Sequence, residues 1–279
     1  MILPRLLTAI IGIPLVLLCI YFGGIPFFLL ITVIVLFSLQ EYFFLSEKGN
    51  YSIQRITGYF FGLLLLFSIF FSGTNIITAG KNQLNSIILT LFLFFSFLYQ
   101  IISIKISNKD LRGSIQRISV TLFGVFLICW TFGHILLLRD IKPDGEKYTY
   151  FLFILIWITD TAAYFVGIKF GKHRLAKSIS PKKTIEGAIG GIIIGILSGI
   201  FMWKILPLKE FSLKEITVLT FVIIILAYIS DLSESLLKRD AGVKDTDSLL
   251  PGHGGFLDRF DSFLFTAPVL YYYLSIFHK

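Results

Sequence analysis

The sequence predicts an all-α, polytopic membrane protein with about nine transmembrane helices. Hydrophobic residues make up 56% of the 279 residues, the mean hydropathy is +0.84, and charged residues account for only 15%. Soluble domains carry roughly a quarter of charged residues and lack repeated uncharged runs of bilayer length. A water-soluble globular protein is therefore excluded.

Apolar runs long enough to cross the hydrocarbon core recur along the chain. A helix rises about 1.5 Å per residue, so about 20 residues cross a core of about 30 Å. In the last two runs the pattern is weaker, because polar residues follow Ser230 and Pro268 lies inside the final run. The predicted spans are residues 6–22, 25–45, 56–77, 84–104, 118–138, 148–168, 187–203, 216–237 and 260–277.

The basic residues predict the orientation of the chain in the membrane. Most of the 25 Lys and Arg fall on the side that holds the N-terminus when the spans alternate. Because such residues are retained in the cytoplasm, we expect a cytoplasmic N-terminus in the cell (inner) membrane. The net charge of +8 is spread over short loops, which does not indicate a nucleic-acid partner.

Chemically distinctive residues gather in the second half of the chain. The spans in residues 1–140 are nearly featureless, which indicates a scaffold that gives access to lipid. In residues 141–279, acids, bases and glycines collect at helix ends on the predicted cytoplasmic side. We expect this region to form the catalytic part, with a polar cavity that faces the cytoplasm.

Two acids at membrane depth are the first candidate functional groups. Asp160 lies inside the span 148–168, where an ionised carboxylate is costly unless it faces a polar cavity, a partner or a metal ion. A structural ion pair or a hydrogen bond between helices is the alternative. Asp231 follows the uncharged part of the span 216–237, and Glu234 comes three residues later on the same helical face. Such a pair can hold a divalent cation, or it can cap or solvate the helix.

A long polar segment, SLLKRDAGVKDTDSLLPGHGGFLDRFD at 235–261, cannot cross lipid. Gly254 and Gly255 beside His253 favour a bent backbone whose N–H groups can approach phosphate oxygens. Asp258 and Asp261 are three residues apart where a helix resumes, so both can point toward one site. Basic groups for phosphate and acidic groups for metal are typical of phosphoryl and nucleotidyl transfer, with a solvated loop as the alternative.

Two further patterns surround the span 187–203. Lys182 and Lys183 in SISPKKTIEG stand at a predicted helix entrance, where anions are favoured, although anchoring on the cytoplasmic side explains them nearly as well. A small-residue stripe along the span predicts close helix packing, inside one subunit or between two. Its members are Gly187, Gly191, Gly195 and Gly199.

Together these motifs resemble the phosphatidate cytidylyltransferases, also called CDP-diacylglycerol synthases, of bacterial type. The segment 235–261 is similar to the long C-terminal signature of that family, and 160–167 (DTAAYFVG) and 180–187 (SPKKTIEG) are similar to two shorter motifs. The likeness covers about a hundred residues, while the first helices match only in hydropathy. Asp247 departs from the pattern, which usually has a small residue there.

The resemblance implies a transferase of phospholipid biosynthesis, which transfers the cytidylyl group of CTP to phosphatidic acid and gives CDP-diacylglycerol and pyrophosphate. It implies a multi-pass enzyme that depends on Mg²⁺, with a second cation such as K⁺, forms a homodimer and faces the cytoplasm. It makes Asp231 and Asp258 the magnesium ligands, and Asp160 is a third candidate from its place in the membrane. The candidate catalytic residues are Asp231, Asp258, Lys244 and Arg259, and the candidate substrate-binding residues are Ser180, Lys182, Lys183, Lys238, Arg239, His253, Gly254, Gly255 and Asp261.

Two other functions compete with this one. A CTP-dependent polyprenol or lipid kinase shares some of the motifs, but the full HGG-x-x-DR-x-D run at 253–261 favours cytidylyl transfer. An ion-coupled transporter would also place acids inside the membrane. Transporters tend to have repeated halves, whereas the two halves of this chain differ in chemistry.

Overall fold

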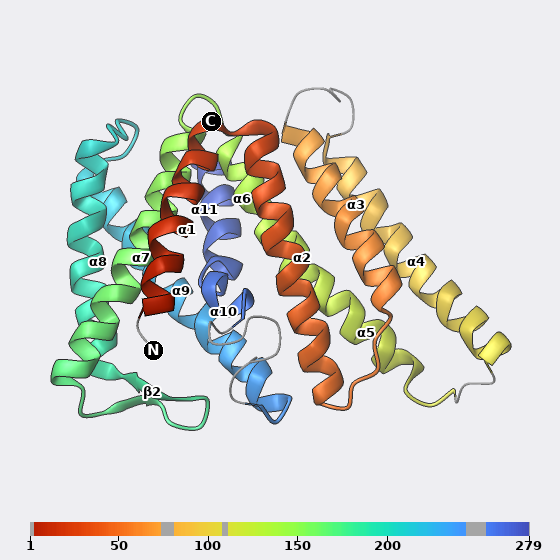
Figure 1. The fold of residues 1–279 in the computed structure, drawn as a ribbon. Helices are drawn as coiled ribbons and strands as arrows, with labels where there is room; N and C mark the ends of the chain where they lie inside the picture. The colour runs from red at the N-terminus through yellow and green to blue at the C-terminus, as the bar shows by residue number, and fades with distance from the viewer. Residues whose placement is uncertain (1–2, 74–80, 108–110, 244–254, 279) are drawn as a thin grey trace.

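The computed structural model describes residues 3–73, 81–107, 111–243 and 255–278. Within these ranges the chain is almost entirely helical (Figure 1). The elements are α1 (Leu3–Phe22), α2 (Gly24–Lys48), α3 (Arg55–Gly73), α4 (Lys81–Ser107), α5 (Ser114–Gly124), the π-helical turn η1 (Val125–Trp130), α6 (Thr131–Arg139), α7 (Gly145–Phe170), β1 (Arg174–Ala176), β2 (Ser180–Thr184), α8 (Ile185–Ile205), α9 (Leu213–Asp240), α10 (Leu257–Phe260) and α11 (Phe263–Phe277).

Eight helical segments of the described chain are long and apolar enough to cross a membrane. Two of them combine several elements: α5, η1 and α6 form one segment, Ser114–Arg139, and α10 with α11 form another, Leu257–Phe277. In α1 the apolar part is shorter and runs over Ile10–Phe22. The predicted all-α, polytopic architecture is therefore confirmed.

The helices pack into one bundle, and several of the charged residues of the second half of the chain come from α7, α9 and α10. In Figure 1, α7, α8 and α9 lie together at one side, α3, α4 and α5 at the other, and α2, α6 and α11 between them. Phe153 of α7 and Phe263 of α11 are fully buried, and their ring centroids lie 4.4 Å apart. The C-terminal ends of α2, α7 and α9 lie at the same end of the bundle as the β1–β2 strands (Figure 1).

The segment between α7 and α8 contains structure that the sequence did not predict. β1 and β2 pair antiparallel as a small hairpin. Lys182 and Lys183 lie on β2 and directly precede the start of α8, so they stand at a helix entrance as predicted, on a strand that was not predicted. The helix begins at Ile185, because the Thr184 side chain caps it while its own backbone is still extended.

The glycine stripe of α8 packs inside a single chain. All four of its glycines are buried. Gly191 faces the Tyr228 hydroxyl, which donates a hydrogen bond to the backbone oxygen of Ala188 at 3.1 Å. A Cβ at Gly195 would meet Thr159 of α7 at 2.7 Å, and one at Gly199 would meet Thr220 of α9 at 2.5 Å. The stripe therefore lets α8 approach both neighbours closely, as predicted.

Replacing a stripe glycine should loosen the bundle. We expect Gly199→Ala to cost about 1–3 kcal/mol, because the new methyl group meets the stiff, β-branched side chain of Thr220. The thermal unfolding midpoint of the purified protein in detergent measures the effect. Gly12→Ala is the matched control, since its Cβ would meet nothing within 4 Å. Equal midpoints for the two variants would show that the close approach of α8 to α9 contributes nothing.

Candidate active site

A first group of charged residues joins α7, α9 and the hairpin. Lys183 of β2 forms an ion pair with Asp231 of α9, and both side chains are about a quarter exposed. Asp160 of α7 lies within electrostatic range of both residues. Its side chain remains exposed rather than packed. One ammonium group therefore stands beside two carboxylates contributed by two different helices.

A second group lies further along α9. Lys238 forms ion pairs with Glu234, one helical turn earlier and 2.7 Å away, and with Asp258 of α10. Glu234 is fully buried, whereas the Asp258 side chain is 27% exposed. Glu234 and Lys238 share one face of α9 because they are four residues apart. Asp258 is thus the more accessible of the two carboxylates that pair with Lys238.

Asp261 lies between the two groups. Electrostatic interactions connect it with Asp160, Asp231, Glu234 and Lys183. Its carboxylate accepts the backbone N–H of Ser262 at 2.5 Å, and its backbone oxygen accepts the Ser230 hydroxyl of α9.

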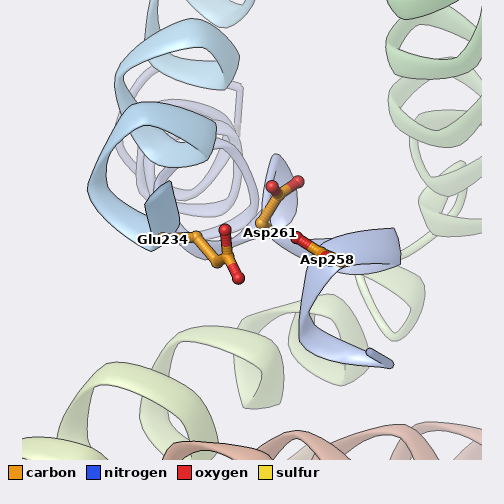
Figure 2. A group of neighbouring side chains, drawn as sticks. All are labelled: Glu234, Asp258 and Asp261. Carbon is orange, nitrogen blue, oxygen red and sulfur yellow. The ribbon is translucent and has the colours of Figure 1, made fainter. Parts of the chain in front are cut away.

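Three of these acids converge closely enough to share an ion. One oxygen from each of Glu234, Asp258 and Asp261 lies within 4.8 Å of the others. Figure 2 shows that Glu234 reaches this point from α9, while Asp258 and Asp261 come from the turn at α10. Glu234 stands out in the sequence through its spacing from Asp231, but it was not among the predicted site residues.

The charges of the two groups do not balance. Five carboxylates, from Asp160, Asp231, Glu234, Asp258 and Asp261, interact with two lysines, Lys183 and Lys238, among the described residues. Uncompensated carboxylates are costly at a helix end inside a membrane. The excess negative charge and the oxygen ligands together suit a hard divalent cation.

The hairpin is tied to the end of α9 by Arg239. Its Nε donates a hydrogen bond to the backbone oxygen of Ile179 at 3.0 Å, and its Nη1 donates to that of Val243 at 3.3 Å. Ser180, a candidate substrate contact, is the half-buried first residue of β2. Lys182 on the same strand is exposed. Arg239 therefore fixes the strand that carries Lys183, in addition to any contact with substrate.

The glycine motif is anchored from an unexpected direction. Gly255 is buried, and a Cβ there would collide with the carboxylate of Glu41 on α2. The Leu257 amide donates a hydrogen bond to that carboxylate at 2.9 Å. The expectation that the spans before residue 140 are featureless is therefore wrong at Glu41. A lone acid in the span 25–45 was the available signal, by the same reasoning that singled out Asp160.

The other predicted site residues are placed only in part. Arg259 is exposed on α10. Lys244, His253 and Gly254, as well as the unusual Asp247, lie outside the described residues. The roles assigned to individual residues remain predictions, and what the structure adds is their grouping.

The fold and the site define a multi-pass helical membrane protein with a carboxylate-rich cluster, bridged by lysines, in the C-terminal halves of α7 and α9 and at α10. The model of the cytidylyltransferase family matches residues 3–277. The chain belongs to this family.

Proteins of similar sequence share the name phosphatidate cytidylyltransferase. The chain is 35% identical over 268 residues to the phosphatidate cytidylyltransferase of Staphylococcus haemolyticus, covering 95% of this chain and 96% of that protein. It is 31% identical over 301 residues to the phosphatidate cytidylyltransferase of Synechocystis sp., covering 98% and 96%. The phosphatidate cytidylyltransferase of Bacillus subtilis is 43% identical over 161 residues, a match that covers 57% of this chain and 58% of that protein.

The position of Lys238 between two carboxylates gives a prediction for stability. We expect Lys238→Met to destabilise the fold by about 3–5 kcal/mol, because it leaves Glu234 buried without its partner. Lys182→Met, which removes an exposed lysine, is the control. Thermal unfolding in detergent without divalent cations compares the two. An unfolding midpoint for Lys238→Met equal to that of the control would show that the ion pairs do not hold this end of the bundle.

Proposed function

We propose that this protein transfers the cytidylyl group of CTP to phosphatidic acid, which gives CDP-diacylglycerol and pyrophosphate for phospholipid synthesis. The carboxylate-rich cluster with its two lysines is the observation that carries the proposal. The names of the relatives support the choice of substrates. No observation favours the polyprenol kinase or the transporter.

The donor set fits a bound Mg²⁺, which we propose as the cofactor, with K⁺ as a candidate second cation. The buried Glu234 carboxylate has Lys238 as an ion-pair partner at 2.7 Å, and one of its oxygens lies within 4.8 Å of an oxygen of Asp258 and one of Asp261. Several carboxylate oxygens that converge on one point are the hard ligands that such a cation requires. The family resemblance keeps Asp231 and Asp258 as the proposed principal ligands, with Asp160 as a third candidate. Of these, Asp258 belongs to the converging acids Glu234, Asp258 and Asp261 in the described part of the chain, whereas Asp231 pairs with Lys183. When bound, the cation would neutralise negative charge on the triphosphate and on the developing pyrophosphate.

The reaction joins two anions, so the role of the protein is to hold them together. An oxygen of the phosphatidate phosphate forms a bond to the α-phosphorus of CTP, and the bond from that phosphorus to the oxygen bridging to the β-phosphorus breaks. The electron pair leaves with pyrophosphate. The attacking phosphate is largely ionised at neutral pH, since a second phosphate pKa lies near 6, and it needs no strong general base.

The chain's own cations then bind and orient the phosphates. The Lys183 side chain is about a quarter exposed while its ammonium nitrogen is enclosed beside Asp231, so it would contact a phosphate oxygen by turning away from Asp231. The exposed Lys182 and Arg259 can receive the outer phosphates. Lys238 is largely enclosed between two acids, so it orients Asp258 in addition to any direct substrate contact.

Orientation and assembly complete the proposal. We place the site at the cytoplasmic face, because the last turn of α7 and the segment from there through the hairpin carry Lys169, Lys172, Arg174 and Lys177, and such residues are retained in the cytoplasm. The hairpin lies at the same end of the bundle as the C-terminal ends of α7 and α9 (Figure 1). Phosphatidic acid would enter from the membrane, where the exposed apolar surface of the helices meets lipid. We also propose a homodimer on the strength of the family resemblance.

A product assay tests the reaction. Purified protein with CTP, phosphatidic acid and Mg²⁺ should release pyrophosphate and form a CDP-lipid, and EDTA should stop both, because the clustered acids would then lack their cation. Thin-layer chromatography of labelled nucleotide identifies the products. Formation of CDP by transfer of the γ-phosphate would establish a kinase instead. If EDTA left the formation of both products unchanged, the proposed metal dependence would be rejected.

Two single substitutions test the metal ligands. Asp231→Asn and Asp258→Asn should each lower turnover by at least about 100-fold, because each removes a charged oxygen ligand while preserving the shape of the side chain. Asp240→Asn, at the exposed end of α9, is the matched control. Chromatographic profile and thermal stability report on folding. Near-normal rates in either test variant would exclude that residue as a ligand.

A further inference from the structure

Glu41 is a buried carboxylate that the proposed reaction does not use. It lies on α2, which contributes none of the five clustered acids, and its exposed fraction is 0%. A carboxylate is rarely enclosed in this way unless its contacts stabilise it. Its carboxylate contacts the turn that precedes Asp258.

The contacts of α2 cover three consecutive residues of that turn. The Glu41 carboxylate accepts the Leu257 amide at 2.9 Å and fills the space in which a side chain on Gly255 would lie. One turn earlier on the same face of α2, the ring of Phe37 stacks on that of Phe256, with centroids 4.7 Å apart and planes 13° from parallel.

The turn held in this way leads directly to the ion pair. Asp258 follows Leu257, which is fully buried, and its carboxylate pairs with Lys238. The amides at the start of a helix lack partners within the helix, so the Glu41 oxygen satisfies a donor that would otherwise be buried without one. A displaced turn would move Asp258 relative to Glu234 and Asp261, whose oxygens now converge with its own.

We propose that Glu41 is a positioning residue, which fixes the backbone at 255–257 so that Asp258 meets the cation and Lys238. The expected effect on turnover rests on the proposed function, whereas the contact between Glu41 and the Leu257 amide does not depend on that function. Residues that orient metal ligands typically change metal affinity or activity by about 10–100-fold when they are removed. Glu41 acts in this way through the main chain rather than through a side-chain hydrogen bond to Asp258.

The test compares Glu41→Ala and Glu41→Gln with Glu47→Gln, an exposed glutamate on the same helix that pairs with Arg55. For each full-length variant we would measure kcat, KM for CTP and the Mg²⁺ concentration for half-maximal activity, per folded molecule. Hydrogen exchange of peptides covering 255–262 provides a readout that does not depend on turnover.

For Glu41→Ala we expect kcat to fall about 10–100-fold, the Mg²⁺ requirement to rise, and the amides near Leu257 to exchange faster. Glu41→Gln keeps a carbonyl acceptor and the side-chain shape, so its kcat, Mg²⁺ requirement and amide exchange should lie between those of Glu41→Ala and the wild type. If Glu41→Ala does not fold, Glu41→Gln takes its place in the test. Glu47→Gln should match the wild type.

Unchanged kcat and Mg²⁺ requirement per folded molecule in both Glu41 variants would overturn the proposal, even if stability fell. Unchanged exchange at 255–262 would do the same. If the wild-type protein itself made no CDP-lipid, the proposed function would fail, and the exchange data would still decide whether Glu41 holds the turn.

Discussion

The mutual repulsion of carboxylates within the C-terminal halves of membrane helices is the constraint on which the site depends. Asp160, Asp231 and Asp261 interact with one another, and among the described residues Lys183 offsets their charge. The second group is organised in the same way around a single lysine. Like charges in a poorly polar environment repel strongly unless cations separate them. The cluster is therefore a binding site for positive charge before it is a binding site for phosphate.

The rest of the fold keeps these charges in place. Asp160 and Asp231 belong to α7 and α9, and α8 packs against both helices through its glycines, so the glycine stripe sets how far apart the two acids lie. Arg239 adds the hairpin by binding Ile179, which brings Lys183 to the same end. Helix packing thus positions the two acids, and Arg239 positions the strand that carries Lys183.

The fold could be predicted because span length and hydropathy are local properties, and Asp160 stood out because acids are rare at membrane depth. The pairing of Lys238 with Glu234 follows from helical spacing, whereas its pairing with Asp258 depends on packing that spacing does not specify. The hairpin was missed because three- and five-residue strands carry too little periodicity to recognise. Glu41 could have been recognised as an acid at membrane depth, but its role could not, because its partner Leu257 lies 216 residues away in the sequence.

A glycine in a sequence motif can be required for a different reason from the one that the motif suggests, as Gly255 shows. Its sequence context suggested a backbone that approaches phosphate, yet in the structure it is buried and faces the Glu41 carboxylate. Any side chain there would collide with that carboxylate, so the close approach alone requires glycine. The same approach lets Glu41 bind the Leu257 amide directly before Asp258. The glycine and the buried acid therefore form one device, in which the first helices of the chain take part in shaping the site formed by the last.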